Sequence, residues 1–483
     1  MFTRLIIWVG AGTPWPQVNS YFCDQVLFDM EFSLTKEEEQ DALESYIQFL
    51  KQPSISATGE GIMETADLLN SLFQQAGIKT AVRKTDGHPI VTGEYNTGAA
   101  RTILVYNHYD VQPVDPLNEW RHGPFSADIA NGRVYARGAA DNKGTLIARL
   151  LGFKKFLEEK AAGLNFKFLV EGEEEIGSPH LERFIRDNAT TLHADAVIME
   201  GGGLDAKGRP QIILGVKGLL YLQLDISIGE RDLHSSNAVI TENAAWKLLN
   251  VLSTIKGSDG HVLVPGFYDD VKPLREEYLS MVDTYDIDPS DLERSLGVTR
   301  LTKKTRKEVA LALFNEPSCN IDGLASGYSG TGAKTIVPAK AFAKLDFRLV
   351  PDQDPQKILQ LLRNHLAKVG FEGEIKVLSS EFPVRSPSNT ALVTALKNSA
   401  AKIYGKQSCL IPNSPGTQPM SLFTHVLGIG EAVSAIGAGG PLSAVHAPNE
   451  NVEIDLFYKA ILHSAQFFYE YALANPGPSP LEK

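Results

Sequence analysis

A histidine and a carboxylate lie two residues apart in the segment Tyr106–Pro113, which reads YNHYDVQP. His108 and Asp110 follow Thr102–Val105, an apolar run that predicts a buried strand. At an extended strand end, residues i and i+2 point to the same face, so these two side chains can meet. The pair suits a metal-binding imidazole and the carboxylate that orients it. A surface histidine beside a turn aspartate is at least as common, so other motifs must decide.

Four further motifs carry side chains that could share one site. Asp141 precedes a predicted helix, where an ordinary N-cap is the simpler reading. The glutamates from position 171 to 175 would repel each other, which a solvated loop tolerates and a divalent cation offsets. The motifs are Gly138–Gly144 (GAADNKG), Glu171–Ser178 (EGEEEIGS), Met199–Gly203 (MEGGG) and Ala444–Glu450 (AVHAPNE).

These motifs follow predicted strands or lie in loops, in a part of the chain where predicted strands and helices alternate. Strands near 166–170 and 194–199 alternate with a helix over 142–161, which predicts an α/β layer with a mainly parallel sheet. Active sites of such sheets gather at the carboxyl ends of the strands. A set of histidines and carboxylates without thiolate suits zinc, manganese or cobalt. A carboxylate shared by two metal ions is typical of sites that deprotonate a bound water.

The pattern changes from about Val216. Residues 257–312 are polar and irregular, with helical pieces rich in Lys, Arg and Glu, and we assign no chemistry to them. The remaining elements predict an α+β sandwich, with one sheet covered on one face by two helices. They are strands near 219–228, 317–322, 339–349 and 373–379 and helices near 242–254 and 355–368.

We therefore expect an α+β domain inserted into an α/β domain. The predicted parts are an N-terminal extension (1–30), the catalytic domain (31–215 and 386–474), the insertion (216–385) and a tail (475–483). Translation could start at Met1 or at Met30.

Composition excludes several classes of protein. The formal net charge of −12 disfavours nucleic acid and anionic membranes as partners. No stretch reaches the roughly 18 apolar residues of a membrane span, and the short N-terminal apolar run lacks a clear cleavage site. Cys23, Cys319 and Cys409 are far apart, which indicates free thiols in a reducing compartment. We therefore expect a cytoplasmic protein.

The order of the motifs makes a family resemblance specific. HYDVQP, WRHGPF, RGAADNKG, EGEEEIGS, RDLHS, FRLVP and a late histidine follow one another over about residues 36 to 473. This series resembles the M20 family of metallopeptidases, and its carnosinase-like dipeptidases most of all. The resemblance implies a zinc-peptidase-like catalytic domain with a ferredoxin-like lid and dimerisation domain.

The resemblance also implies roles for single residues. His108, Asp141 and Glu200 would hold one metal ion, and Asp141, Glu175 and His446 the other. Zn²⁺ is the expected metal, with Mn²⁺ or Co²⁺ as alternatives. Sequence chemistry alone cannot decide between Glu173, Glu174 and Glu175; the family pattern makes Glu174 the general base and Glu175 the ligand. Asp110 would orient His108.

The resemblance also implies a particular geometry for the peptide bond between residues 141 and 142. The family places a cis peptide between Asp141 and Asn142. Many members have a second aspartate where this chain has Asn142, and we expect little consequence. The position of Glu200 is occupied by aspartate in the nearest dipeptidases and by glutamate in other branches. This residue therefore does not support the assignment to the dipeptidase subgroup.

The predicted insertion adds further candidates. In the family the histidine at His234 stabilises the oxyanion in the site of the other subunit, which implies a homodimer. Arg348 would pair with the terminal carboxylate of the substrate, and Thr335 would contact the substrate. Taken alone, His234 and Arg348 would be solvated or structural side chains. Thr417 could replace a family serine, but the arginine of the family's Arg-x-Gly-Gly-Ser stretch is absent from 413–419.

Three functions remain at this point. The first is a two-metal hydrolase that cleaves dipeptides or short peptides with a free C-terminus. The second is an N-acyl-amino-acid deacylase that uses the same site; the long segment 257–312 favours the dipeptidase. The third is an inactive scaffold, which the intact ligand set and Glu174 disfavour.

Overall fold

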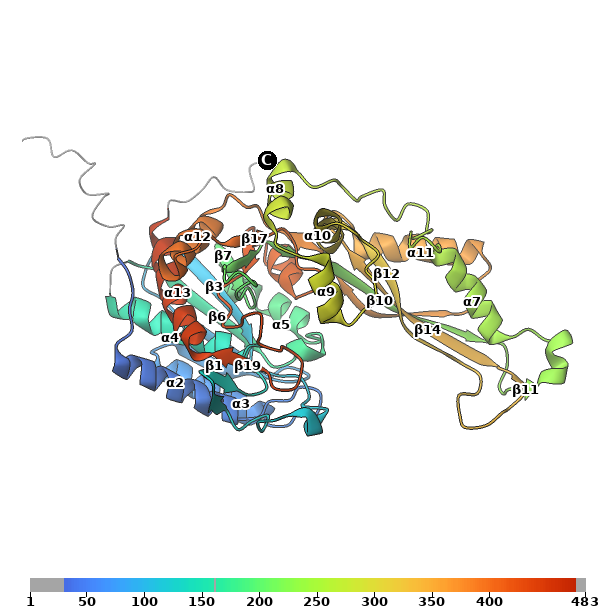
Figure 1. Cartoon of the computed structure of the whole chain (residues 1–483), viewed down its shortest axis with the longest axis horizontal. Coiled ribbons are helices and arrows are strands. Elements are labelled where there is room, and N and C mark those ends of the chain that lie inside the picture. Colours follow the sequence, from blue (N-terminus) through green and yellow to red (C-terminus); the bar gives the residue numbers. More distant parts are fainter. Residues whose placement is uncertain (1–29, 160–161, 475–483) are drawn as a thin grey trace, which may run out of the picture.

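The computed structural model describes residues 30–159 and 162–474 (Figure 1). Nearly all of the predicted extension and the whole predicted tail lie outside these residues. Two lobes are visible, one built on a large sheet and one on a smaller sheet that reaches away from it.

The large lobe is organised around an eight-stranded mixed sheet with the order β1-β2-β6-β3-β7-β18-β8-β17. Strand β3 pairs in parallel with both β6 and β7, and β7 pairs in parallel with β18, so the centre is parallel as predicted. The strands are β1 (Lys79–Arg83), β2 (Ile90–Tyr95), β3 (Thr102–His108), β6 (Asn165–Glu171), β7 (Ala196–Met199), β8 (Gln211–Ile213), β17 (Cys409–Ile411) and β18 (Ala432–Ser434).

Helices cover both faces of this sheet, and buried side chains form a separate core on each face. Helix α2 begins with the predicted capping box, in which Thr35 and Glu38 bond each other's backbone N–H groups. Helices α4 and α13 pack so closely that a Cβ at Gly152 would lie 2.4 Å from Cβ of Ser464. The helices are α2 (Lys36–Lys51), α3 (Ile62–Gln75), α4 (Lys143–Glu159), α5 (Leu181–Asp187), α6 (Ala189–Leu192), α12 (Ala391–Tyr404) and α13 (Ile454–Leu473).

The second lobe has a four-stranded antiparallel sheet with the order β12-β14-β10-β15. Side chains of β10 and β14 alternate strictly between buried and half-buried, because helices cover only one face. This lobe has a core of its own, so the predicted sandwich is present. Its elements are β10 (Gly218–Ser227), α7 (Ala244–Ile255), β12 (Ser318–Ser326), β14 (Lys340–Leu349), α11 (Pro355–Lys368) and β15 (Glu374–Glu381).

The irregular segment 257–312 contains three helices, α8 (Glu276–Thr284), α9 (Pro289–Leu296) and α10 (Arg306–Asn315). The start of the segment packs in the core of the second lobe, through Val262, Val264 and Phe267. Tyr278 of α8 and Ala310 of α10 are instead buried in the core of the large lobe, although both helices begin inside the predicted insertion.

Short strands complete the described chain. Strands β9 (Gly215–Val216) and β16 (Val384–Arg385) pair where the chain passes between the lobes. Strands β11 (Leu233–His234) and β13 (Ile336–Val337) pair at the far end of the second lobe. Strands β4 (Asp128–Ala130), β5 (Arg133–Tyr135) and β19 (Asn451–Glu453) form a small separate sheet.

Two simple sequence expectations can be compared with the structure. Cys319 and Cys409 are buried free thiols, whereas Cys23 lies outside the described residues. Among the described residues no helix is both long and apolar enough to cross a bilayer.

Candidate active site

His108 ends strand β3 and is completely buried. Its Nε2 lies 3.1 Å from Oδ1 of Asp141, and its Nδ1 lies 3.4 Å from Oδ1 of Asp110. The carboxylate of Asp110 also accepts the backbone N–H groups of Glu174 at 3.2 Å and Glu175 at 3.0 Å. Asp110 therefore fixes both the imidazole and the start of the acidic loop.

His446 reaches the same point from the loop before α13. Its Nε2 lies 3.2 Å from Oδ2 of Asp141 and 3.1 Å from Oε2 of Glu175. Asp141 thus has an imidazole against each of its two oxygens. One ligand atom from each of His108, Asp141 and Glu175 falls within 4.8 Å of the others. The carboxylate of Asp141 faces these histidines, as a bridging ligand would require.

Glu200 follows β7, and its carboxylate receives two amide groups. Asn142 Nδ2 lies 3.4 Å from Oε2, and Gln418 Nε2 contacts Oε1. The peptide bond between Asp141 and Asn142 is cis, as the resemblance implies. Asn142 was expected to matter little, but it contacts a predicted metal ligand.

The three adjacent glutamates point in different directions. Glu173 contacts Nδ1 of His180 at 2.8 Å and accepts the backbone N–H of His88 at 3.0 Å. Glu175 faces His446, and Glu174 lines a large cavity. Glu173 is therefore occupied elsewhere, which leaves Glu174 and Glu175 at the site.

Burial and the gathering of charges shift the pKa values of the site. Burial raises the pKa of Glu174 well above its usual value; His108 opposes this shift, and the neighbouring carboxylates of Glu200, Asp141 and Glu175 add to it. Burial also raises the pKa of Glu200 to about 7, with repulsion from Asp141 adding to it. Hydrogen bonds to Asp141 and Glu175 raise the pKa of His446 to about 10. The carboxylates gather here at a cost that nearby cations would offset.

The donor set fits divalent metal ions. Oε1 of Glu175 is buried and has no hydrogen-bond partner, which is costly for a carboxylate oxygen. Imidazole nitrogens and carboxylate oxygens converge on this point, and no thiolate is among them. Such a set suits zinc and related ions.

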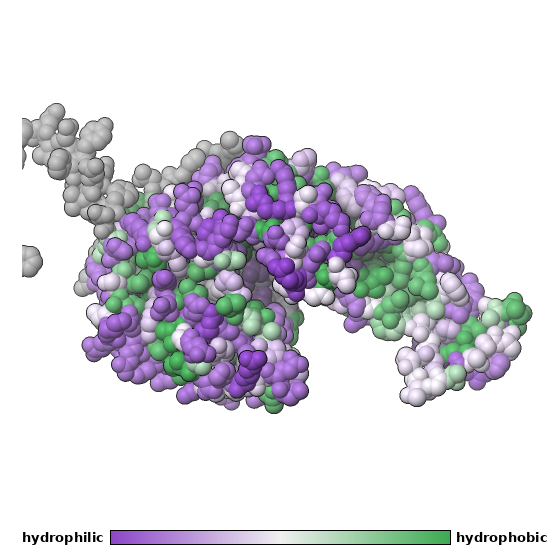
Figure 2. All heavy atoms as spheres, viewed as in Figure 1, coloured by the Kyte–Doolittle hydropathy of each residue, from purple (hydrophilic) through white to green (hydrophobic). Residues whose placement is uncertain are grey.

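A cavity of about 1090 Å³ is lined from both lobes and includes Glu174, which precedes Glu175 in the chain. Figure 2 shows the molecule hollowed between the two lobes. Glu174 lines the cavity on the large-lobe side, and Arg348 lines it from β14. Arg348 Nη1 donates to Oγ1 of Thr417 at 2.8 Å, and its Nε lies 3.3 Å from Asp346. Arg348 and Thr417 thus share a cavity with Glu174 of the same chain.

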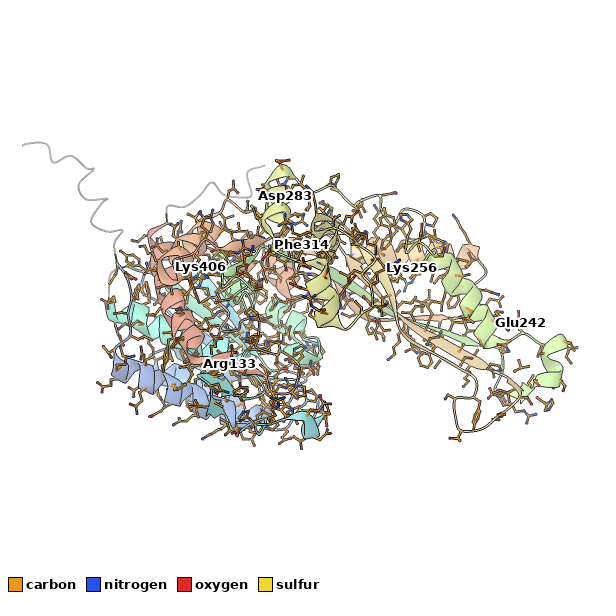
Figure 3. All side chains as sticks on the ribbon, viewed as in Figure 1. Arg133, Glu242, Lys256, Asp283, Phe314 and Lys406 are labelled. Carbon is orange, nitrogen blue, oxygen red and sulfur yellow. The ribbon has the colours of Figure 1, made fainter. Side chains whose placement is uncertain are left out.

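His234 and Thr335 belong to the second lobe and do not line this cavity. His234 is exposed and belongs to β11, which lies at the outer end of the second lobe (Figure 1). Glu242, which Figure 3 labels, lies at the same end of this lobe. The carbonyl of Thr335 accepts the N–H of Ser235 at 3.1 Å, so the two candidates are neighbours. Neither lines the cavity that holds Glu174 in its own chain.

Sequence reasoning missed several side chains that support the site. Gln112 donates to Oε2 of Glu175 at 2.9 Å. Arg149 is fully buried and donates to the carbonyls of Tyr106 and Met199, at the ends of two central strands. The carboxylate of Glu450 lies under the Asp141 loop. Gln112 and Glu450 belong to motifs that the sequence had already singled out, whereas Arg149 lies outside all of them.

Comparison with known proteins settles the family. The sequence profile of peptidase family M20/M25/M40 matches residues 104–472, which is most of the chain. The chain belongs to this family. It is therefore a metallopeptidase, as the motif order predicted.

Individual relatives agree with this assignment. The chain is 28% identical over 454 residues to a Cys-Gly metallodipeptidase of Schizosaccharomyces pombe, covering 88% of this chain and 94% of the relative. It is 26% identical to the human Beta-Ala-His dipeptidase over 80% of this chain and 78% of the relative. Among solved structures, an M20 metallo-carboxypeptidase from Sulfolobus solfataricus is 54% identical, with a TM-score of 0.87 over 89% of this chain and 99% of that one.

Proposed function

We propose that this chain is a two-metal peptidase that cleaves the bond before a free C-terminal carboxylate in dipeptides or short peptides. The observation that supports the proposal is the shared cavity, which is lined by Arg348 and Thr417 together with Glu174, the residue next to the proposed ligand Glu175. A guanidinium is suited to a terminal carboxylate, so Arg348 would fix the C-terminus while the preceding bond lies near Glu174.

The ligand set divides between two metal positions. His108, Asp141 and Glu200 would hold one ion, and Asp141, Glu175 and His446 the other. Zn²⁺ is our proposed metal, with Mn²⁺ or Co²⁺ as alternatives. When bound, such a pair polarises the scissile carbonyl and makes a bound water acidic near neutral pH.

The chain's own residues move the proton and hold the geometry. Glu174 takes a proton from the attacking water on its carboxylate and passes it to the leaving amine. Burial raises the pKa of this carboxylate, which makes it a stronger acceptor for the proton of the water. Asp110 keeps His108 in place through Nδ1.

His234 completes the site only if a second copy of the chain supplies it. We propose a homodimer in which the second lobe makes the contact and His234 stabilises the oxyanion in the partner's site. Strand β12 is at the edge of its sheet. Trp246 and Leu249 on α7 are 65% and 43% exposed, so apolar surface is available for such a contact. Thr335 lies beside His234 and would contact the same substrate.

We also propose a cytoplasmic location, because the buried Cys319 and Cys409 are unpaired thiols, which persist in reducing compartments. Small peptides are the proposed partners; nucleic acid and membrane surfaces are not.

Hydrolysis of two substrate panels tests the function. The chelated protein is reconstituted with Zn²⁺, Mn²⁺ or Co²⁺ and assayed on unmodified dipeptides and on N-acetyl and N-succinyl amino acids. Cleavage of the dipeptides supports the peptidase. Cleavage confined to the acylated panel would instead assign the chain to the deacylases, which use the same site.

A further inference from the structure

Thr417 and Gln418 are consecutive residues that contact two different parts of the site. Thr417 Oγ1 accepts the hydrogen bond from Arg348 at 2.8 Å. Gln418 Nε2 contacts Oε1 of Glu200, and its Oε1 accepts from Ser434 Oγ at 2.9 Å. Arg348 belongs to the second lobe and Glu200 to the large one. One dipeptide therefore joins the proposed carboxylate-binding side chain to a proposed metal ligand.

Gln418 is well placed to orient Glu200. A carboxylate on a flexible side chain loses rotamer freedom when it binds a metal, and a fixed donor lowers that cost in advance. The amide of Gln418 is itself fixed at its other end by Ser434, a fully buried residue of β18. The amide of Gln418 also lies close to Gly201, the residue after Glu200. A Cβ at Gly201 would be 3.6 Å from Gln418 Nε2.

The segment that carries this dipeptide is stiff. Prolines at positions 412, 415 and 419 each fix a φ angle. The buried Asn413 donates from Nδ2 to the carbonyls of Val216 at 3.0 Å and Val384 at 2.9 Å, one on each strand that connects the lobes. Asn413 anchors the start of the segment, and Pro419 follows the dipeptide directly, so a displacement of Thr417 would pass to Gln418.

We propose that Gln418 is a positioning residue for Glu200, and that the Thr417–Gln418 dipeptide couples carboxylate binding at Arg348 to the orientation of this metal ligand. The coupling rests on the proposed function, in which Arg348 binds the substrate and Glu200 the metal. The segment 413–419 is where the chain lacks the arginine of the carnosinase-type pattern. In this chain, Thr417 and Gln418 of the same segment would instead contribute to substrate binding and catalysis through their contacts with Arg348 and Glu200.

Metal affinity tests the positioning role without any assay of activity. Zn²⁺ is titrated into chelated wild type, Gln418→Leu and Gln356→Leu against a chromophoric chelator. Gln356 lines the same cavity but donates to Ser380 Oγ at 3.0 Å, which makes it a matched control. Loss of a residue that orients a ligand weakens metal binding about 10- to 100-fold, and this is expected for Gln418→Leu alone.

Ser434→Ala provides a second variant should Gln418→Leu fold poorly. It removes the hydrogen bond that fixes Gln418 and leaves every side chain that contacts Glu200 in place, so a smaller loss of metal affinity is expected. Wild-type affinity in both folded variants would overturn the positioning role.

A double-mutant cycle tests the coupling. Thr417→Val, Gln418→Leu and the double variant are compared by kcat and KM on one dipeptide. Coupled residues give a combined loss in kcat/KM that differs from the product of the single losses by at least about threefold. A simple product would overturn the coupling. If the proposed function were wrong, the wild type would not cleave the unmodified dipeptides, while the metal titration would still report on Gln418.

Discussion

Glu450 accepts the backbone N–H of Asp141 at 3.0 Å through an oxygen that also accepts the N–H of Ala140 at 2.9 Å. Its other oxygen accepts from Gly138 N and Arg137 Nη1, both at 2.9 Å. Glu450 is fully buried and belongs to the loop that carries His446. One carboxylate therefore joins the loops of two predicted metal ligands.

Replacing Glu450 by glutamine should disrupt both loops. The amide NH₂ would face backbone N–H donors and leave buried groups unpaired, at a cost of about 2–4 kcal/mol. The expected result is a lower melting temperature together with weaker Zn²⁺ binding in a chelator competition. Glu453→Gln is the control, because its ion pair with Arg133 is partly exposed and contributes about 0–1 kcal/mol. Equal effects in the two variants would contradict the role of Glu450.

Glu174→Gln should abolish proton transfer and spare metal binding. An amide cannot take the proton of the attacking water, so kcat should fall about 10²- to 10⁴-fold. Metal content by elemental analysis should match the wild type, because Glu174 is not among the proposed ligands. Turnover equal to that of the wild type would show that the measured activity does not depend on Glu174, and would support the hypothesis of an inactive scaffold.

Arg348→Ala should raise KM for peptides with a free C-terminus while the metal stays bound. The guanidinium contacts Thr417 and Asp346, and neither is a proposed ligand. We expect KM to rise about 10- to 100-fold, the usual consequence of losing a charged hydrogen bond of about 1.5–3 kcal/mol. Arg348→Lys should recover part of this. Loss of metal in Arg348→Ala would show that the residue is structural.

Subunit mixing tests the proposed dimer. His234→Ala and Glu174→Gln should each be inactive alone. When the two are mixed, a heterodimer pairs intact Glu174 of one subunit with intact His234 of the other at one of its two sites. Random exchange should therefore restore about a quarter of wild-type activity, if His234 acts in the partner's site. A mixture as inactive as its components would exclude that action.

The stability of the large lobe should depend on pH through His463. Burial lowers the pKa of this α13 side chain to about 3, against an ordinary value of 6.5. Between these values the unfolded chain binds a proton that the folded chain does not, so stability is lost as pH falls below 6.5. His463→Gln removes this term. Relative to wild type, its free energy of unfolding by urea should rise by about 2 kcal/mol from pH 7 to pH 5. A pH-independent difference would contradict this.

Local patterns predicted the elements because each has its own physical signal. The amphipathic helix near 355–368 is observed as α11, Pro355–Lys368, with Asp354 as its N-cap. The alternating strand near 219–228 is observed as β10, where one face is buried. The sequence of residues 257–312 did not predict the lobe in which its helices pack, because an apolar face on a short helix does not specify which core it joins.

The candidate site was harder to predict where contacts are long-range. The motifs placed His108, Asp141, Glu175 and His446 at one sheet edge, and the structure brings them together. The contact between Gln418 and Glu200 left no trace in the sequence, since a lone glutamine carries no spacing rule. Such amides are found only once the fold has set which loops meet.

Metal stoichiometry measured together with hydrolysis is the direct test of a two-metal peptidase. The protein is stripped by a chelator, Zn²⁺ is added stepwise, and bound metal and cleavage of one unmodified dipeptide are followed in the same samples. We expect no activity from the stripped protein and maximal activity once two ions are bound per chain. Full activity without metal, or saturation at two ions with no peptide cleavage by any metal tested, would contradict this expectation.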